Sequence, residues 1–191
     1  VGLRAVDLVE GDHLVGTAII DGSQNIMLFS SEGKAVRFAE TDVRAMGRVS
    51  KGVRGMRLPE NHSVISMVIP ELDGFLLTVC ENGYGKRTKV DEFPTKGRGG
   101  KGMIAIQASE RNGPLVGSTQ LFAGDEIMLI SDQGTMVRTR GDEVSVVGRN
   151  TQGVRIIRLK ETENLVRLAR IAEPEEEEVY VEDDAVEGTA T

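Results

Sequence analysis

The chain has 191 residues and a formal net charge of −7, with 39% hydrophobic but only 4% aromatic residues and no tryptophan. This length suits one domain of ordinary size, and its core must be aliphatic. The single cysteine excludes an intramolecular disulfide and favours a reducing compartment, the cytoplasm. No stretch reaches the ~20 apolar residues that a membrane-spanning helix needs, so we expect no membrane partner.

The charge is unevenly distributed along the chain. Nine of the 30 acidic residues follow residue 171, where there is no Lys or Arg, so the first 171 residues carry 23 basic and 21 acidic side chains. A segment with so much charge and so few apolar residues does not form a core. We therefore expect a disordered acidic tail over 172–191, attached to a slightly basic body.

The body consists of a repeat of about 50 residues. Two sets of glycines mark it at spacings of 50 and 51 residues: Gly33, Gly83 and Gly134, and then Gly52, Gly102 and Gly153. Just before the second glycine of each repeat lies a glycine- and arginine-containing segment. We call these segments, 47–52, 97–102 and 148–153, the basic loops. Self-similarity at this period predicts an array of supersecondary units.

Each repeat contains four short apolar or β-branched runs, which predict four strands. In chain order these runs are 14–20, 26–30, 34–38 and 52–58; 64–69, 75–80, 84–88 and 102–107; and 115–121, 127–131, 135–139 and 153–159. The middle two runs of each repeat are joined by a turn that contains Gly33, Gly83 or Gly134, where glycine supplies the positive φ of a tight hairpin. A longer connection, ending in the basic loop, leads to the fourth run.

Four antiparallel strands per repeat predict an all-β fold of propeller-like blades. Segment 2–8 aligns with the fourth strand of a repeat, and segment 165–171 aligns with the first. We therefore expect a partial array over 1–171, truncated at its amino end. It comprises a half-blade at 1–10, repeats at 11–60, 61–111 and 112–162, and a terminal strand at 163–171.

Catalytic constellations are almost absent from the sequence. His13 and His62 occupy near-equivalent places before a first strand, which favours a structural role, and Cys80 sits without a CxxC partner in an apolar run. The segment 97–102 matches G-x-G-x-x-G, but it precedes a strand instead of opening a helix, so the dinucleotide-binding interpretation fails. We expect no catalytic residue and no metal site.

The basic positions are the better functional candidates, because an arginine recurs at two positions in every repeat, in the third strand and in the basic loop, and further Arg and Lys residues lie nearby. The predicted DNA-binding residues are Arg37, Arg44, Arg48, Lys51, Lys86, Arg87, Lys96, Arg98, Lys101, Arg138, Arg140 and Arg149. Guanidinium groups bind phosphate bidentately, and loop N–H groups add further donors. Few aromatic residues interleave with them, which favours sequence-tolerant contact with a duplex backbone over stacking on single strands. The alternative is a set of solvated charges on a propeller that serves as a scaffold for protein–protein interaction.

Four stretches resemble the C-terminal domain of bacterial DNA gyrase A. They are VRAMGR at 43–48, NGYGKRT at 82–88, FPTK at 93–96 and VGRNTQGV at 147–154. The resemblance implies a β-pinwheel, a propeller-like disc usually of six blades, whose basic perimeter wraps double-stranded DNA. The family's box, Q-R-R-G-G-K-G, is matched at five of seven places by 96–102, which lacks the Gln and the first Arg. This segment therefore resembles a degenerate copy in a later blade.

The resemblance also implies a larger enzyme around this domain. Gyrase is an ATP-dependent type II topoisomerase that negatively supercoils DNA, built as a heterotetramer of gyrase A and gyrase B. The resemblance places the catalytic tyrosine outside this chain, and it assigns ATP and Mg²⁺ to gyrase B and the whole enzyme, with no cofactor here. The C-terminal domain of topoisomerase IV, which has the same architecture, is the nearer alternative.

Overall fold

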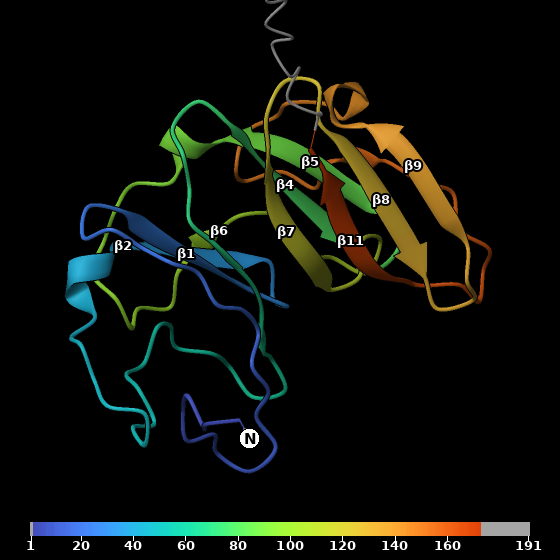
Figure 1. The fold of residues 1–191 in the computed structure, drawn as a ribbon. Helices are drawn as coiled ribbons and strands as arrows, with labels where there is room; N and C mark the ends of the chain where they lie inside the picture. The colour runs from blue at the N-terminus through green and yellow to red at the C-terminus, as the bar shows by residue number, and fades with distance from the viewer. Residues whose placement is uncertain (1, 173–191) are drawn as a thin grey trace, which may run out of the picture.

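The computed structural model describes residues 2–172, so the predicted tail lies outside the described residues beyond Ala172. The regular secondary structure of these residues is almost entirely β-strand, as predicted, with three short 3₁₀ helices (Figure 1). The elements are β1 (Asn25–Ser30), β2 (Lys34–Ala39), η1 (Glu40–Asp42), β3 (Val64–Val68), β4 (Phe75–Cys80), β5 (Tyr84–Lys89), η2 (Val90–Glu92), β6 (Met103–Ile104), β7 (Leu115–Leu121), β8 (Glu126–Ser131), β9 (Met136–Arg140), η3 (Gly141–Glu143), β10 (Val154–Arg155) and β11 (Leu165–Ile171).

The strands form three antiparallel sheets, each centred on one hairpin. The strand orders are β3-β1-β2-β6 in the first sheet, β10-β5-β4-β7 in the second and β11-β8-β9 in the third. The hairpins β1–β2, β4–β5 and β8–β9 turn at Gly33, Gly83 and Gly134, whose φ angles are 81°, 80° and 82°. These angles confirm the glycine-based hairpin prediction, because L side chains rarely adopt them.

The sheets differ from the predicted blades in where their strands come from. The first sheet takes its hairpin from the first repeat but its two flanking strands, β3 and β6, from the second. The second sheet likewise combines the β4–β5 hairpin with β7 and β10 of the third repeat. Adjacent repeats therefore interlock by exchanging strands, so that no complete sheet belongs to a single repeat.

This exchange explains the predicted strands that do not form. Segments 2–8, 14–20 and 52–58 are not strands, and the predicted fourth strands 102–107 and 153–159 shorten to the two-residue strands β6 and β10. First and fourth strands pair with the hairpin of the preceding repeat, and no hairpin precedes residue 25 among the described residues. Without a hydrogen-bonding partner, an apolar extended segment stays outside a sheet. Ile19 in this region is 99% exposed.

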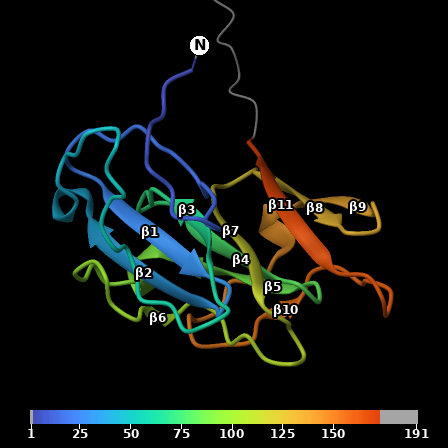
Figure 2. The same ribbon diagram turned by 90° about the horizontal axis from the view of Figure 1, so that it is seen from below.

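The three sheets lie side by side like an open fan (Figure 2). Strand β7 contacts both β3 and β11, so these three strands lie along the inner side of the fan. β6 and β10 are at the opposite edge of their sheets, which we call the outer edge. The core fills the space between successive sheets, with Met27 and Phe29 against Leu76 in one cluster and Leu77 with Ile127 in the next, so it is mainly aliphatic but includes buried phenylalanines.

Candidate nucleic-acid interface

The basic loops lie at the outer edge because each leads directly into the fourth segment of its repeat. Each loop also docks on the preceding repeat through one recurring backbone hydrogen bond. The donors and acceptors are Asp7 N to Ser50 O (3.2 Å), Arg57 N to Gly100 O (2.8 Å) and Gln107 N to Thr151 O (2.9 Å). Equivalent positions in successive repeats therefore carry the three loops to equivalent places along the outer edge.

Besides Arg138, half of the predicted DNA-binding residues are exposed, five of them on or near these loops and Arg140 at the end of β9. They are Arg44, Arg48, Lys51, Lys96, Lys101 and Arg140. None of these side chains makes a hydrogen bond or an ion pair within residues 2–172, so their charges are free to meet an external anion. Lys96 is fixed through its backbone, because its N–H donates to Arg37 O at 2.7 Å.

The loop arginines Arg98 and Arg149 are half-buried and serve partly to dock the loops. Arg98 Nη1 donates to Arg54 O at 2.9 Å, and Arg149 Nη1 donates to the equivalent carbonyl, Ile104 O, at 2.7 Å. Arg98 Nε also donates to Asp42 O at 3.2 Å. Each guanidinium keeps N–H donors that make no hydrogen bond within the described part of the chain, so both remain candidates for phosphate contact.

The interpretation of Arg37 and Arg87 as surface groups is wrong, because both are buried at 9% and 8% exposure. Arg37 Nη1 donates to Val90 O and Phe93 O at 3.2 and 3.0 Å, and burial lowers the pKa of its guanidinium. These carbonyls belong to η2 and the residue after it, in the next repeat. The recurring arginine of the third strand is therefore a clamp between adjacent repeats.

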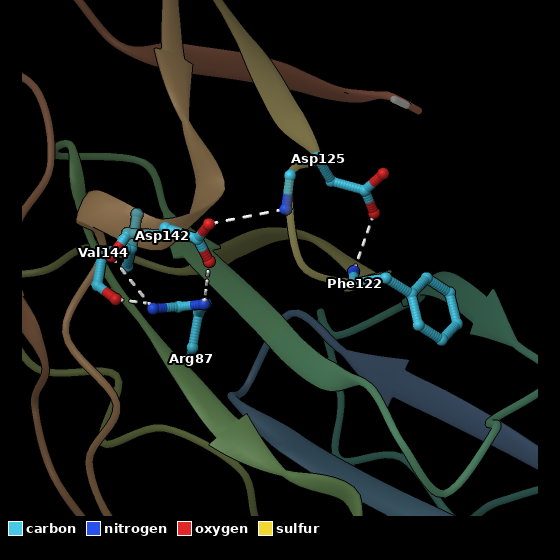
Figure 3. A network of polar contacts seen from close by, with 6 residues as sticks. Arg87, Phe122, Asp125, Asp142 and Val144 are labelled. Atoms are coloured by element: carbon cyan, nitrogen blue, oxygen red, sulfur yellow. Dashed lines mark hydrogen bonds and ion pairs between the residues drawn. The ribbon is translucent and has the colours of Figure 1, made fainter. Parts of the chain in front are cut away.

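Arg87 makes the same clamp on η3 with a more complete set of contacts (Figure 3). Its Nε donates to Val144 O at 2.8 Å, and Nη1 and Nη2 bind Oδ1 and O of Asp142, each at 3.0 Å. The guanidinium also lies 5.0 Å from the centroid of the Phe75 ring. Asp142 Oδ2 accepts from Gly124 N at 3.4 Å, which ties the β7–β8 turn to the same network.

Arg138, the third member of this set, has a different environment. It is exposed on β9, and the described residues contain no 3₁₀ turn of a following repeat for it to hold. Its guanidinium pairs instead with Glu126 on the neighbouring strand β8. Its contact with DNA stays a prediction.

Lys86 was also predicted at the surface, and this is wrong, since its side chain has 0% exposure. Its ammonium bonds to the third basic loop, and burial lowers its pKa from 10.5 to about 8. The predicted set therefore divides into exposed charges, partly docked loop arginines and three buried cations, Arg37, Arg87 and Lys86.

Sequence reasoning missed a second group of cations around Tyr84. The guanidinium carbons of Arg111 and Arg155 lie 4.2 and 5.1 Å from the Tyr84 ring centroid. Arg155 also donates to Tyr84 Oη at 2.5 Å, which lowers the pKa of the phenol. With Arg158 and Lys160, these residues line a cleft of about 430 Å³ that also holds two carboxylates.

A sequence signal for part of this group exists. Arg155 and Arg158 follow the third basic loop at the same places that Arg54 and Arg57 occupy after the first loop, while the second repeat has Ile104 and Gln107 there. All four arginines are exposed. The recurrence of these arginines in two of the three repeats was the sequence signal that could have identified them.

His62 and Cys80 have structural environments, whereas His13 is exposed. His62 Nδ1 lies 3.0 Å from Ser31 Oγ, and Cys80 is buried, which raises the pKa of its thiol to about 12. Within residues 2–172, no group of three or more His, Cys, Asp or Glu side chains is arranged to hold a metal ion. In the same range, no helix has the length and apolar character needed to cross a membrane.

The family model described as "DNA gyrase C-terminal domain, beta-propeller" matches the chain three times, at residues 24–71, 74–117 and 125–172. Each matched unit starts at a hairpin and extends to the strand that follows it, β3, β7 or β11, although the second unit ends within β7. The matched units therefore start later than the predicted repeats and keep each hairpin together with the inner strand that pairs with it.

Curated relatives agree with this match. The chain is 53% identical over 189 residues to the DNA gyrase A protein of Escherichia coli, covering 99% of this chain and 21% of that protein. It is 57% identical over 173 residues to the corresponding protein of Pseudomonas aeruginosa, covering 91% of this chain and 19% of that protein. The chain thus spans about a fifth of the length of the curated relatives it matches.

Solved structures share the fold. A DNA gyrase A C-terminal domain superposes with a TM-score of 0.81 at 27% identity, over 90% of this chain and 58% of that one. A topoisomerase IV C-terminal domain gives 0.82 at 21% identity, over 87% and 52%, and at that identity it supports the fold alone. Three interlocked hairpin units, matched one by one by the family model, show that the chain belongs to the family of DNA gyrase C-terminal domains with a β-propeller fold.

Proposed function

We propose that this chain is the DNA-wrapping part of a DNA gyrase A protein and binds duplex DNA along its outer edge. The observation that carries the proposal is the row of exposed, unpaired Arg and Lys side chains on and beside successive basic loops. Family membership supports the same function. Because the loops repeat along a fan, a duplex that follows them must bend.

The chemistry of this edge favours contact with phosphates. Its exposed cations lie beside glycine-rich loops, where guanidinium, ammonium and backbone N–H groups all donate to anionic oxygens. The aromatic side chains Phe29, Phe38 and Phe93 are buried in the core, so they offer no stacking surface to unpaired bases. Binding of this kind tolerates any sequence and depends strongly on salt.

In the whole enzyme, this domain would present a wrapped DNA segment to the cleavage domain of gyrase A. Gyrase B, in a heterotetramer with gyrase A, would supply ATP-driven strand passage with ATP and Mg²⁺. This chain would contribute no catalytic group of its own. The cytoplasm is the proposed compartment, as for an enzyme that acts on bacterial DNA.

The first test is the salt dependence of duplex binding. Each phosphate contact contributes about 0.9 to the slope of log K against log salt. The double variant Lys96→Gln/Lys101→Gln should bind all duplex sequences more weakly and with a flatter slope. The control Arg167→Gln removes a charge from the inner strand β11 and should leave the slope unchanged. A loss confined to certain sequences would indicate base recognition instead.

The second test separates wrapping from simple binding. A closed DNA circle is relaxed by a type I topoisomerase in the presence of the chain, and the linking number is measured after protein removal. Wrapping with a fixed hand should shift the mean linking number in one direction, and the variant Lys96→Gln/Lys101→Gln should reduce this shift. If DNA binding did not depend on salt and the mean linking number did not shift, the alternative function, a scaffold for protein–protein interaction, would be favoured.

A further inference from the structure

The third basic loop is built around a buried ammonium group. Lys86 Nζ donates to Gly148 O at 2.7 Å, to Arg149 O at 2.5 Å and to Thr151 Oγ1 at 3.1 Å. An ammonium has three donors and no acceptor, so these three contacts satisfy it completely. The equivalent residues of the other repeats are Val36 and Val137, and this arrangement is therefore specific to the junction between the second and third repeats.

The contacts determine which way the loop peptides face. In a trans peptide, the C=O of one residue and the N–H of the next point in opposite directions. Because Gly148 O and Arg149 O both point inward to Lys86, the N–H groups of Arg149 and Asn150 point away from it. Arg149 N donates to Glu92 Oε2 at 2.8 Å, whereas the Asn150 N–H makes no hydrogen bond within residues 2–172.

We propose that Lys86 is a positioning residue for the third basic loop, which turns the Asn150 N–H outward as a donor to an anionic oxygen. The loop stays docked on the preceding repeat in that orientation, through Gln107 N to Thr151 O and Arg149 Nη1 to Ile104 O. Lys86 acts through the loop and never touches the anion. The anion that would accept from the Asn150 N–H is a phosphate of duplex DNA, and this part of the inference rests on the proposed function.

The electrostatic surroundings of Lys86 make its contacts with the loop depend on pH. Burial lowers the pKa of Lys86 to about 8, while the Glu92 carboxylate raises it and the Arg149 guanidinium lowers it. Cys80 also faces Lys86, but its own pKa of about 12 keeps the thiol neutral below pH 10. The neutral amine has two donors instead of three, so deprotonation leaves one loop acceptor without a donor.

The direction of the Lys86 pKa shift distinguishes an effect on the geometry of the loop from an effect on the stability of the fold. The folded-state pKa lies below the ordinary value of 10.5, so the unfolded chain binds more protons between pH 8 and 10.5. Lys86 therefore makes the free energy of unfolding increase with pH in that window, because its protonated form is less favourable in the folded chain than in the unfolded one. Burying a charged group in this way is not by itself a sign that the group stabilises the fold. The inferred role of Lys86 is to select one loop conformation.

The experiment is an NMR titration of the labelled full chain. The Lys86 side-chain signals and the amides of 148–151 should shift together with a midpoint near pH 8. In Lys86→Met the loop transition should vanish, and in Glu92→Gln it should move to lower pH. Lys89→Met, which removes an exposed lysine from the same strand, should change neither. A Lys86 midpoint at or above 10, or a transition that persists in Lys86→Met, would overturn the proposal.

Hydrogen exchange and DNA binding provide two further measurements. In Lys86→Met the amides of Gln107 and Arg149 should exchange roughly tenfold faster than in the wild type, because buried carbonyls lose their donor. Duplex affinity should fall by roughly fivefold relative to the charge-matched variant Arg167→Met. Unchanged exchange in a folded Lys86→Met chain refutes the positioning role. Absence of DNA binding by the wild type refutes the proposed function and leaves the loop measurements standing.

Discussion

The recurring third-strand arginine shows how one residue type takes different roles at equivalent positions. Arg37 and Arg87 each hold the 3₁₀ turn of the following repeat through buried hydrogen bonds. Arg138 lies at the same place in its repeat but pairs with Glu126 on its own hairpin. The role of this arginine is therefore decided by the neighbouring repeat.

The variants Arg87→Met and Arg138→Met test this clamp. Arg87→Met should lower the free energy of unfolding by about 2–4 kcal/mol, since buried acceptors lose a charged donor. Arg138→Met should change it by less than about 0.5 kcal/mol, as exposed ion pairs contribute little. Urea denaturation measures both. Equal effects would show that Arg87 is not a clamp.

The hairpin glycines form a second matched pair. A Cβ on Gly83 would lie 2.6 Å from Ile157 O, whereas a Cβ on Gly134 would meet nothing within 4 Å. Both have positive φ, which costs an alanine about 1–2 kcal/mol. Gly134→Ala should lose only this amount, and Gly83→Ala should lose roughly 1–3 kcal/mol more because its neighbour is backbone. Identical denaturation midpoints would contradict the close packing of the β4–β5 turn.

At the scale of elements, the fold is held together by strand exchange. The short strands β6 and β10 belong to one repeat and complete the sheet of the repeat before it. The carbonyl groups of Gly33 and Gly83 strengthen the junction, because each accepts two N–H groups from the segment that follows β6 or β10. Segment 52–58 has no such hairpin among the described residues and remains outside a sheet.

Limited proteolysis should detect this difference. Trypsin should cut first after Arg44, Arg48, Lys51 or Arg54, which are exposed and lie just before or within the unpaired segment. The equivalent sites in the second and third repeats should resist longer, because β6 and β10 dock those loops on a hairpin. Mass spectrometry of early fragments identifies the order. Simultaneous cleavage of all three basic loops would mean that strand exchange does not stabilise them.

For the whole molecule, the distribution of charge matters more than its total. The net charge of −7 includes the acidic segment after residue 171, while the body carries a small positive excess. Several exposed cations, among them Arg48, Lys96 and Lys101, lie at the outer edge on or beside the basic loops. The segment 173–191 lies outside the described residues, so its effect on that edge is predicted from charge alone.

Deletion of 175–191 should strengthen duplex binding at low salt. A tethered polyanion competes with DNA phosphates at an effective concentration in the millimolar range. The gain should shrink as salt rises, because both contacts are screened. Binding isotherms at several salt concentrations measure it. Weaker binding after deletion would mean that the segment helps to position the blades, and no change at any salt would leave only a solubilising role.

Much of the candidate site could be predicted from sequence, because recurrence identifies positions that lie in equivalent places. The exposed Arg48 was found in this way, whereas Arg44, Lys51 and Lys101 were chosen because they lie near the recurring arginines. Recurrence alone does not distinguish a residue that binds DNA at the surface from a buried residue that holds adjacent repeats together. Residues of both kinds occupy the same place in every repeat. Arg37 and Arg87 were misplaced for this reason. Lys86 does not recur and was included only because it lies next to Arg87, and Arg155 was missed because its recurrence is incomplete.

The sequence by itself determined the period, the all-β class, the three hairpins and their glycine turns. These features are local, since a turn's φ angles and the alternation of a strand depend on residues close together in the chain. Only the tertiary structure decided which repeat completes each sheet and which cations are buried. β2 pairs with β6 more than 60 residues later, and such a partner is selected by packing between repeats, which no local pattern encodes.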